Sequence, residues 1–358
     1  MKEEAEGDSG VACDACDCTS WMATSYLEGG GNMDPVIATH LSELKLGELR
    51  HFKRVGIIPL FVSENDGPEY LTLKEALDQD LLLVTEVGSG GSVPELKATN
   101  KSDRPVLLLD GEELAGAKQN RVLNTTILLK EESETIIPVS CTEQGRWSRV
   151  SETLKGTDHV LAGRLRTAKA ASVSYSLKRS RRFESDQGEM WGAIKGLDFC
   201  LGVQSPTGAM KDIFESRGTA LDEYVSELTC VPDQKGLLVF IRGRLVGFDT
   251  LSLTSAYSIL HRKLVKSYAM DALIQRKEKD LKPPVSQARE FLRAAAKCKE
   301  RKYESVGHGW DHRLEGESIV GSALVYQGKV VHMALFPVHE SDRAGRMAGF
   351  MRRRGFRT

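Results

Sequence analysis

The sequence contains no long apolar run. No stretch approaches the ~20 apolar residues of a membrane span, and the acidic first segment has no apolar core of the kind that marks a secretory signal. The formal net charge of −1 argues against a whole-protein attraction to nucleic acid or to an acidic membrane. We therefore expect a cytoplasmic protein that has neither a membrane partner nor a nucleic-acid partner.

Cysteine is too sparse for a disulfide framework. Seven cysteines are spread over 358 residues, which fits a reducing compartment. Cys13, Cys16 and Cys18 could share a zinc or iron ion, but the second C-x-x-C of a zinc module is missing. Seven acids against one lysine also mark residues 1–32 as an acidic tail. We predict that this Cys-containing tail is disordered and that the functional site holds no metal.

Signatures of bound cofactors are also missing. The glycine loop from Gly88 to Ser92 lacks the Lys-Ser/Thr ending of a phosphate-binding P-loop and the helix that follows one, so we predict a hairpin turn. The eight histidines show no metal-binding spacing, and the chain lacks the regular βαβ alternation of a dinucleotide-binding domain. No cofactor is therefore expected.

Strand patterns dominate the first half of the chain. From residue 55 to residue 147 apolar, β-branched segments follow one another with short turns, which favours an antiparallel sandwich or barrel-like sheet. After residue 185 amphipathic helices mix irregularly with strands. We predict an α+β fold in five parts: a disordered acidic tail (1–32), a β-rich domain that carries the polar motifs (33–150), a basic loop (151–184), a mixed α/β region that packs on the first domain (185–340) and a basic disordered tail (341–358).

Three local patterns add detail to this prediction. The segment Val55–Phe61 is typical of a strand, and Pro59 within it suggests a sheet edge or a bulge. Thr72 followed by Glu75 is a capping box, which predicts the start of a short helix. From residue 146 to residue 182 ten Lys or Arg residues stand against two acids and the apolar pattern is lost. We expect a solvated loop there, with a lid near an anionic ligand as the alternative.

Polar residues gather at strand ends between residues 107 and 147. An apolar run ends in the turn Asp-Gly-Glu-Glu (110–113), Lys-Gln-Asn-Arg (118–121) precedes a β-branched strand, and Thr-Glu-Gln-Gly-Arg-Trp (142–147) follows another. Surface loops seldom group acids, amides, arginine and tryptophan in this way. We interpret the stretch as a ligand site. The alternative is a buried polar network that fixes the ends of the strands.

Each residue type in this stretch suits one part of a nucleotide-like ligand. Acids can transfer protons or bind ribose hydroxyls, cations can bind phosphate or carboxylate, and amides can recognise a base or sugar edge. Trp147 could stack on a ring or close the end of a strand. The candidates are Glu112, Glu113 and Glu143 as catalytic acids, and Lys118, Gln119, Asn120, Arg121, Gln144, Arg146 and Trp147 as ligand-binding residues.

Cys141 offers the alternative of a thiol nucleophile. In a strand that runs from residue 135 to residue 143, Ile137, Val139 and Cys141 share one face. The thiol then lies among core residues, and the nearest histidine in the sequence is His159. We predict a core cysteine rather than a catalytic one.

The longest motifs resemble those of one bacterial family. The resemblance is carried by LLLDGEELAGAKQNRVLNTT, IPVSCTEQGRW, SDQGEMW and SPTGAM, together with LKLGELRHFKRVGIIPLF and LVKSYAMDAL. These segments, which span residues 44–340, are similar to the family named for its association with ADP-ribosylglycohydrolases and rhodanese-phosphatase proteins. The resemblance adds Asp186 and Gln187 to the ligand-binding candidates, and the Cys-rich tail departs from the family's pattern.

The resemblance implies a function in NAD chemistry. Association with ADP-ribosylglycohydrolases implies processing of NAD-derived or ADP-ribosylated molecules, with hydrolysis at a ribosyl linkage as the leading reaction. A non-catalytic module that binds ADP-ribose or another nucleotide is the alternative. In either case the expected partner is a small nucleotide or an ADP-ribosylated substrate. The sequence leaves the oligomeric state and the convergence of the three glutamates open.

Overall fold

The computed structural model describes residues 33–62, 67–88, 90–274 and 283–338. Compactness divides the chain into residues 1–30 and residues 31–358, and all described residues belong to the second unit. The predictions of an acidic Cys-containing tail and of a basic tail from residue 341 fall outside the described residues. No helix in the described segments is long and apolar enough to cross a membrane.

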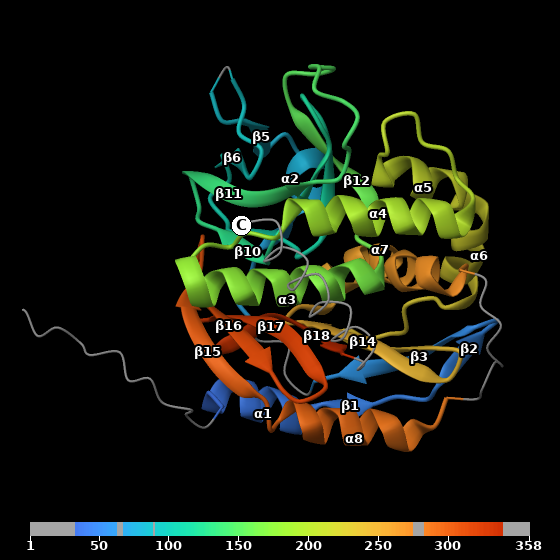
Figure 1. Cartoon of the computed structure of the whole chain (residues 1–358). Helices are drawn as coiled ribbons and strands as arrows, with labels where there is room; N and C mark the ends of the chain where they lie inside the picture. Colours follow the sequence, from blue (N-terminus) through green and yellow to red (C-terminus); the bar gives the residue numbers. More distant parts are fainter. Residues whose placement is uncertain (1–32, 63–66, 89, 275–282, 339–358) are drawn as a thin grey trace, which may run out of the picture. The chain divides into compact units, whose positions relative to one another are not determined.

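A nine-stranded antiparallel sheet takes strands from both ends of the sequence (Figure 1). Val55 lies opposite Ile241 and Leu60 opposite Gly236, so an early strand pairs with a late one along its length. The order is β1 (Lys45–Leu46), β3 (Val55–Phe61), β13 (Gly236–Ile241), β14 (Arg244–Leu251), β18 (Lys329–Pro337), β17 (Ile319–Tyr326), β16 (Trp310–Glu315) and β15 (Lys299–Glu304), with β2 (Arg50–Phe52) also on β3.

The strand β3 lies inside this sheet, and its register with β13 continues without a shift through Pro59, which corrects the prediction of a sheet edge or a bulge there. It pairs with β13 on one side and with β1 and β2 on the other. On the second side β2 meets residues 55–57 and β1 meets residues 60 and 61, so Pro59 falls between the two partners. Its carbonyl accepts a hydrogen bond from Gly47 at 2.8 Å, and its missing N–H interrupts no ladder there.

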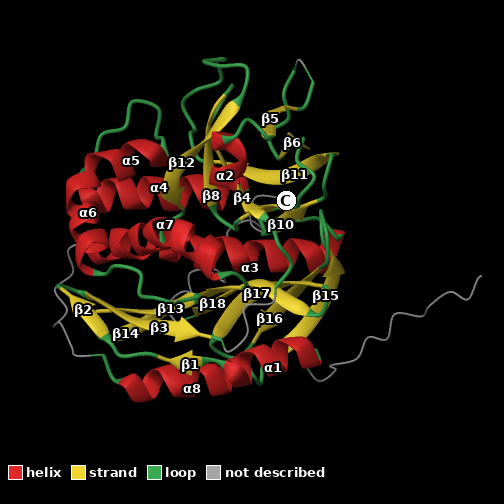
Figure 2. Ribbon diagram, turned by 180° about the vertical axis from the view of Figure 1, so that it is seen from behind, coloured by secondary structure: helices red, strands yellow, loops and turns green. Residues whose placement is uncertain are grey.

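Helices cover both faces of the nine-stranded sheet (Figures 1 and 2). The helices α1 (Pro35–Glu43) and α8 (Val285–Ala295) pack on one face, and α3 (Gly163–Ser180) and α7 (Thr254–Ala272) pack on the other. Every residue of β13 is buried, because alternate side chains enter the two apolar cores.

Two smaller sheets lie on the far side of α3 and α7 and enclose a third apolar core. The six-stranded sheet has the order β12 (Leu154–Val160), β8 (Glu112–Gly116), β9 (Arg121–Leu123), β11 (Ser133–Cys141), β6 (Glu95–Asn100) and β5 (Leu82–Glu86). The three-stranded sheet has the order β10 (Ile127–Leu129), β7 (Val106–Leu108) and β4 (Leu71–Thr72), and α2 (Leu73–Asp78) follows β4. The remaining described helices are α4 (Gln187–Leu201), α5 (Met210–Ser216) and α6 (Gly218–Glu227).

The α+β class is confirmed, because helices and mainly antiparallel strands mix throughout the described unit. The capping box is also confirmed: the Thr72 hydroxyl accepts from the Glu75 N–H at 3.3 Å, and the Glu75 carboxylate accepts from the Thr72 N–H at 2.9 Å. The glycine loop joins β5 to β6 as an antiparallel hairpin, as predicted. The predicted domain boundary at residue 150 does not separate one sheet from another. β1 to β3 precede this boundary but join the nine-stranded sheet, and β12 follows it but joins the six-stranded sheet.

Residues 151–184 differ from the predicted basic loop, because they form β12 and the 18-residue helix α3. The apolar pattern fails in α3 because its buried face includes cations. Arg166 pairs with Asp249, and Lys169 pairs with Asp110. A helix that buries cations against buried carboxylates has no apolar stripe with a period of 3.6 residues. The segment that the sequence predicted as a solvated loop is therefore a helix with a buried face.

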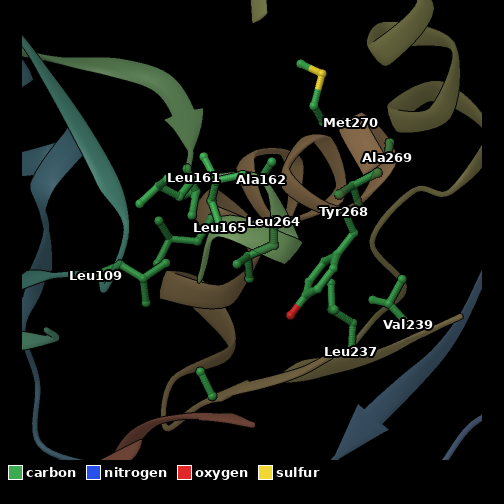
Figure 3. Close-up of a cluster of buried hydrophobic side chains, with 14 of the residues drawn as sticks. Leu109, Leu161, Ala162, Leu165, Leu237, Val239, Leu264, Tyr268, Ala269 and Met270 are labelled. Atoms are coloured by element: carbon green, nitrogen blue, oxygen red, sulfur yellow. The ribbon is translucent and has the colours of Figure 1, made fainter. Parts of the chain in front are cut away.

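A buried polar layer connects α3 and α7 to the nine-stranded sheet. Asp249 of β14 accepts hydrogen bonds from Arg166 at 2.5 and 2.9 Å and from the Tyr268 hydroxyl at 2.6 Å. Burial alone would raise the pKa of Asp249, but Arg166 lowers that pKa to about 2. Apolar side chains surround the layer, and Figure 3 shows Tyr268 among Leu237 and Leu264. The pair is charged at neutral pH and fixes the orientation of α3.

Candidate functional site

Four segments that are distant in the sequence contact one another, and three of them surround Glu143. They are the turn after β8 (residues 117–120), the turn after β11 (142–147), the loop before α5 (205–209) and the end of β5 at residue 86. Backbone hydrogen bonds join three of them: Gly145 N–H donates to the Thr207 carbonyl at 2.7 Å, and Thr142 N–H donates to the Asn120 carbonyl at 3.0 Å. The predicted polar turns therefore touch one another.

Glu143 is the centre of this assembly. Its Oε1 accepts hydrogen bonds from Arg146 Nε at 2.8 Å and from the Thr207 hydroxyl at 2.9 Å. Its Oε2 accepts from Arg146 Nη2 at 2.5 Å and from the Asn120 N–H at 3.1 Å. Burial by itself would raise the pKa of Glu143, but the hydrogen bonds from Arg146 and Asn120 lower it below its usual range. Glu143 is thus ionised, and both of its oxygens are occupied.

The guanidinium of Arg121 is fully buried and only partly hydrogen-bonded. Its Nη1 donates to Gln119 Oε1 at 3.2 Å and to the Asn120 carbonyl at 3.4 Å. Among the described residues its Nε and Nη2 have no hydrogen-bond partner. The Oε1 of Glu86 lies 3.8 Å from Nη2, which is too far for a hydrogen bond, and Oε2 of Glu86 has no partner in the described part of the chain. Arg121 and Glu86 therefore form a buried ion pair without a hydrogen bond between them, and two donors and one acceptor lack a hydrogen-bond partner among the described residues.

Trp147 covers these charges. Its side chain is half exposed, and its ring centre lies 5.8 Å from the Arg121 guanidinium carbon and 5.4 Å from Lys118 Nζ. Lys118 also donates through Nζ to the carbonyl of Gly90 in the hairpin loop and through its N–H to Glu86 Oε1 at 3.2 Å. We refer to Glu86, Lys118, Arg121 and Trp147 as the Arg121 cluster.

Gln187 at the start of α4 fixes the end of β11. Its side-chain amide accepts from the Cys141 N–H at 2.8 Å and donates to the Cys141 carbonyl at 2.9 Å, as a neighbouring strand would. Cys141 is buried, which confirms the predicted core position, and its thiol lies 2.5 Å from Gln119 Oε1. Burial raises the pKa of this thiol to about 11, so it carries no thiolate at neutral pH. Asp186 caps α4 by accepting from the Glu189 N–H at 2.9 Å.

Glu113 is fully buried beside the end of β11. Its carboxyl oxygens accept from the Thr142 hydroxyl at 2.8 Å and from the Thr157 hydroxyl at 3.4 Å. Burial raises the pKa of Glu113 to about 8, and the negative charge of Glu143 adds to this rise. Glu113 is therefore protonated at neutral pH while Glu143 is ionised. Opposite protonation states of two neighbouring carboxyl groups are typical of acid–base pairs.

Glu112 does not join these two acids, because neighbouring residues of a strand point to opposite faces. Its Oε1 accepts a hydrogen bond from Lys263 Nζ of α7 at 2.7 Å, and its Oε2 accepts from the Leu109 N–H at 2.9 Å. Both side chains of the ion pair are buried. Of the three predicted catalytic glutamates, Glu113 and Glu143 thus lie near one another, while Glu112 lies on the opposite face of β8 in a buried ion pair.

Comparison with models of protein families identifies the chain. Residues 43–336 match ARPP-1, the ARG and Rhodanese-Phosphatase-superfamily-associated Protein domain. The chain belongs to this family. The match confirms the resemblance that the sequence motifs carry. No curated protein and no solved structure matches the chain.

The ARPP-1 motifs contain most of the residues around Glu143 and in the Arg121 cluster, but they do not contain Glu86. The signal for Glu86 is in the strand pattern: residues 82, 84 and 86 alternate inward along β5, so the third buried position holds an acid where the first two hold Leu82 and Val84. An acid at a core position points to a buried cation. Thr207 lies in the ARPP-1 segment SPTGAM, but its role became visible only through its contact with Glu143. Gln144 is exposed on the turn.

Proposed function

We propose that this ARPP-1 protein acts on NAD-derived or ADP-ribosylated molecules and binds them at the Arg121 cluster. The observation that carries the proposal is that two donors of the buried Arg121 guanidinium make no hydrogen bond in the described part of the chain, although Glu86 lies 3.8 Å away as an ion-pair partner. A buried donor without a partner costs about 1–3 kcal/mol, and more if it is charged, so a bound anion would recover that energy. Nε and one Nη together form the flat fork that binds a phosphate through two parallel hydrogen bonds.

The other members of the cluster suit the remaining parts of ADP-ribose. The half-exposed indole of Trp147 offers a stacking surface for the adenine ring. The unused Oε2 of Glu86 can accept a hydrogen bond from a ribose hydroxyl. Lys118 adds a second positive charge for the diphosphate, and its long stem allows Nζ to turn from Gly90 towards a ligand.

Trp147 is the movable side of the cluster. Arg121 is fully buried, so a ligand reaches it only if the indole swings away. No hydrogen bond of the Trp147 side chain is seen in the described structure, and half of its surface already faces solvent, so the movement breaks few contacts. The proposed ligand replaces Trp147 over the guanidinium, and the indole then stacks on the ligand's ring.

Recognition is the part of the function that the geometry supports best. Both oxygens of Glu143 are occupied and Glu113 is fully buried, which favours a binding module. Hydrolysis at a ribosyl linkage is the second candidate, and the opposite protonation states of the two acids favour it. In that reaction Glu113 would donate the proton to the leaving group, and Glu143 would stabilise the oxocarbenium-like transition state.

Titration calorimetry tests the recognition step. We expect ADP-ribose to bind more tightly than adenosine or ribose, and its affinity to fall as salt is added, because the diphosphate meets two cations. Arg121→Met keeps the volume of the buried stem and should weaken ADP-ribose binding by about 10- to 100-fold, the contribution of one or two hydrogen bonds to a charged group. Equal affinities for the three ligands would refute the diphosphate site.

Two controls separate the cluster from general charge and folding effects. Arg149 lies two residues beyond Trp147 and pairs with Glu152 on the surface, so Arg149→Met should leave the affinity unchanged. Trp147→Phe should keep most of the affinity and Trp147→Ala should lose about 10-fold, since only the first retains a ring for stacking. Melting curves of all four variants identify any loss that comes from unfolding.

Turnover assays decide between hydrolase and binding module. Release of free ADP-ribose is measured from ADP-ribosylated protein, ADP-ribosylated nucleic acid and NAD. A hydrolase should lose about 100-fold or more of its turnover with Glu113→Gln or Glu143→Gln, while Glu134→Gln, on the exposed face of β11, should have no effect. Tight ADP-ribose binding without release from any substrate would assign the protein to the binding class.

A further inference from the structure

A second cluster of potential ligands lies at one edge of the nine-stranded sheet. Asp34 is the N-cap of α1, Glu300 lies on β15 and His312 lies on β16. Each offers one ligand atom, and the three atoms lie within 4.8 Å of one another. None of these elements contributes to the Arg121 cluster, so this second cluster is independent of the proposed function.

Hydrogen bonds already hold the three residues together. The Asp34 N–H donates to Glu300 Oε2 at 2.5 Å, and His312 Nδ1 shares a hydrogen bond with Glu300 Oε1 at 2.6 Å. The His312 ring is fully buried, and its Nε2 has no hydrogen-bond partner among the described residues. Buried polar groups are normally saturated in a purely structural network. His312 therefore has spare hydrogen-bonding capacity at Nε2, and it faces Glu300 with Nδ1, the nitrogen that an ion between the two residues would bind.

We propose that Asp34, Glu300 and His312 bind a divalent transition-metal ion, with zinc as the preferred ion. One imidazole nitrogen and two carboxylate oxygens form a ligand set that suits zinc, and three protein ligands leave a fourth position for water. The ligands bind in their neutral imidazole and ionised carboxylate forms, so uptake of the ion releases any protons that they carry.

The ion would connect the N-terminus of α1 to β15 and β16 at the edge of the nine-stranded sheet. Asp34 and Glu300 are 266 residues apart in sequence, yet they already share a hydrogen bond. Among the described strands β15 pairs only with β16 and forms an edge of the sheet, and a contact that holds an edge strand in place limits its pairing with other chains. The expected effect of the metal is therefore on stability, not on the Arg121 cluster.

Lys302 would compete with the ion for the carboxylate of Asp34. Its Nζ lies 3.4 Å from Asp34 Oδ2 and 5.0 Å from the ring centre of Trp310. The ammonium group supplies part of the positive charge that an ion would supply. Its side chain is 43% exposed, so Nζ can leave Asp34 for solvent when an ion binds. Removing this charge should strengthen metal binding.

The test uses the full chain with Cys13, Cys16 and Cys18 replaced by serine, which excludes metal uptake by those thiols. Titration with Zn²⁺ and with Co²⁺ should give one ion per chain, and Co²⁺ should develop visible absorption bands. Saturation with Zn²⁺ at 100 times its Kd should raise Tm by about 4 °C. Absence of a stoichiometric ion in this protein would overturn the proposal.

Substitutions identify the ligands. Asp34→Asn keeps the N-cap of α1, since asparagine caps as well as aspartate, and it should weaken metal binding by about 10-fold or more because it removes a ligand charge. His312→Ala should abolish the Co²⁺ bands, and Glu304→Gln, at the exposed far end of β15, should preserve them. Lys302→Met should bind the ion severalfold more tightly. Unchanged affinity in Asp34→Asn or in Lys302→Met would refute the site even if His312→Ala fails to fold.

Discussion

Replacing Lys263 by methionine should destabilise the protein strongly at pH 7 and only weakly at pH 5. The ammonium of Lys263 is the partner of the Glu112 carboxylate at 2.7 Å, and both side chains are almost fully buried. Methionine fills the same stem volume but leaves the carboxylate without its charge partner. Breaking a buried pair in this way costs about 3–5 kcal/mol.

Protonation limits that cost and gives it a pH dependence. A carboxyl group can avoid a buried charge by taking up a proton, which at pH 7 costs an ordinary glutamate about 3.7 kcal/mol. The loss in the free energy of unfolding should therefore be about 3–4 kcal/mol at pH 7, and it should shrink by about 1.4 kcal/mol for each pH unit below that. At pH 5 about 1 kcal/mol remains by the same relation.

Urea denaturation at pH 5, 6 and 7 measures this loss. The double variant Lys263→Met with Glu112→Gln removes both charges and should recover most of the stability at pH 7. Lys178→Met breaks an exposed pair with Glu315 and should cost less than about 1 kcal/mol at every pH. A loss in Lys263→Met that is below about 1 kcal/mol at pH 7, or that is equal at pH 5 and pH 7, would refute the reasoning.

Three further predictions concern single residues. Burial raises the pKa of Glu113 to about 8, so the unfolded chain loses this proton at a lower pH than the folded chain. The stability of the wild type relative to Glu113→Gln should therefore fall by up to about 1.4 kcal/mol per pH unit from pH 5 to pH 8. Urea midpoints of the two proteins that change in parallel with pH would contradict this. Gly247→Ala places a Cβ 2.3 Å from the Tyr268 ring and should cost more than about 2 kcal/mol in thermal unfolding. Gln187→Ala removes both hydrogen bonds to the Cys141 backbone and should cost about 1–2 kcal/mol; unchanged hydrogen exchange at the Cys141 amide would count against it.

Local sequence patterns predicted those elements whose buried faces are apolar. The capping box at Thr72 and the strand at Val55–Phe61 follow from short-range rules. Helix α3 was not predicted because Arg166 and Lys169 occupy core positions, and the carboxylates that pair with them lie on other segments of the chain. The carboxylate that balances Arg166 is Asp249, which is 83 residues away. Patterns within a helix cannot reveal such a partner.

In the candidate site, too, local patterns predicted some features, whereas others depend on contacts between distant segments. The turns that carry Gln119 and Glu143 were predicted to hold polar groups, and the structure shows that they touch. Strand alternation could have separated Glu112 from Glu113, whereas the ion pair with Lys263 depends on how α7 packs. The position of Glu86 beside Arg121 depends on the order of four strands, which short-range patterns do not specify. Binding of a ligand at these residues stays a prediction.

The pairing of β3 with β13 has a consequence for synthesis on the ribosome. β3 ends at Phe61 and β13 begins at Gly236. At the usual 5–20 residues per second, about 175 residues take roughly 9–35 s to emerge. Throughout that interval an apolar strand, which is buried almost completely in the finished protein, has no partner on its β13 side. Nascent chains stalled before residue 236 should therefore bind chaperones and be cleaved near β3, and chains stalled well beyond β13 should resist cleavage there.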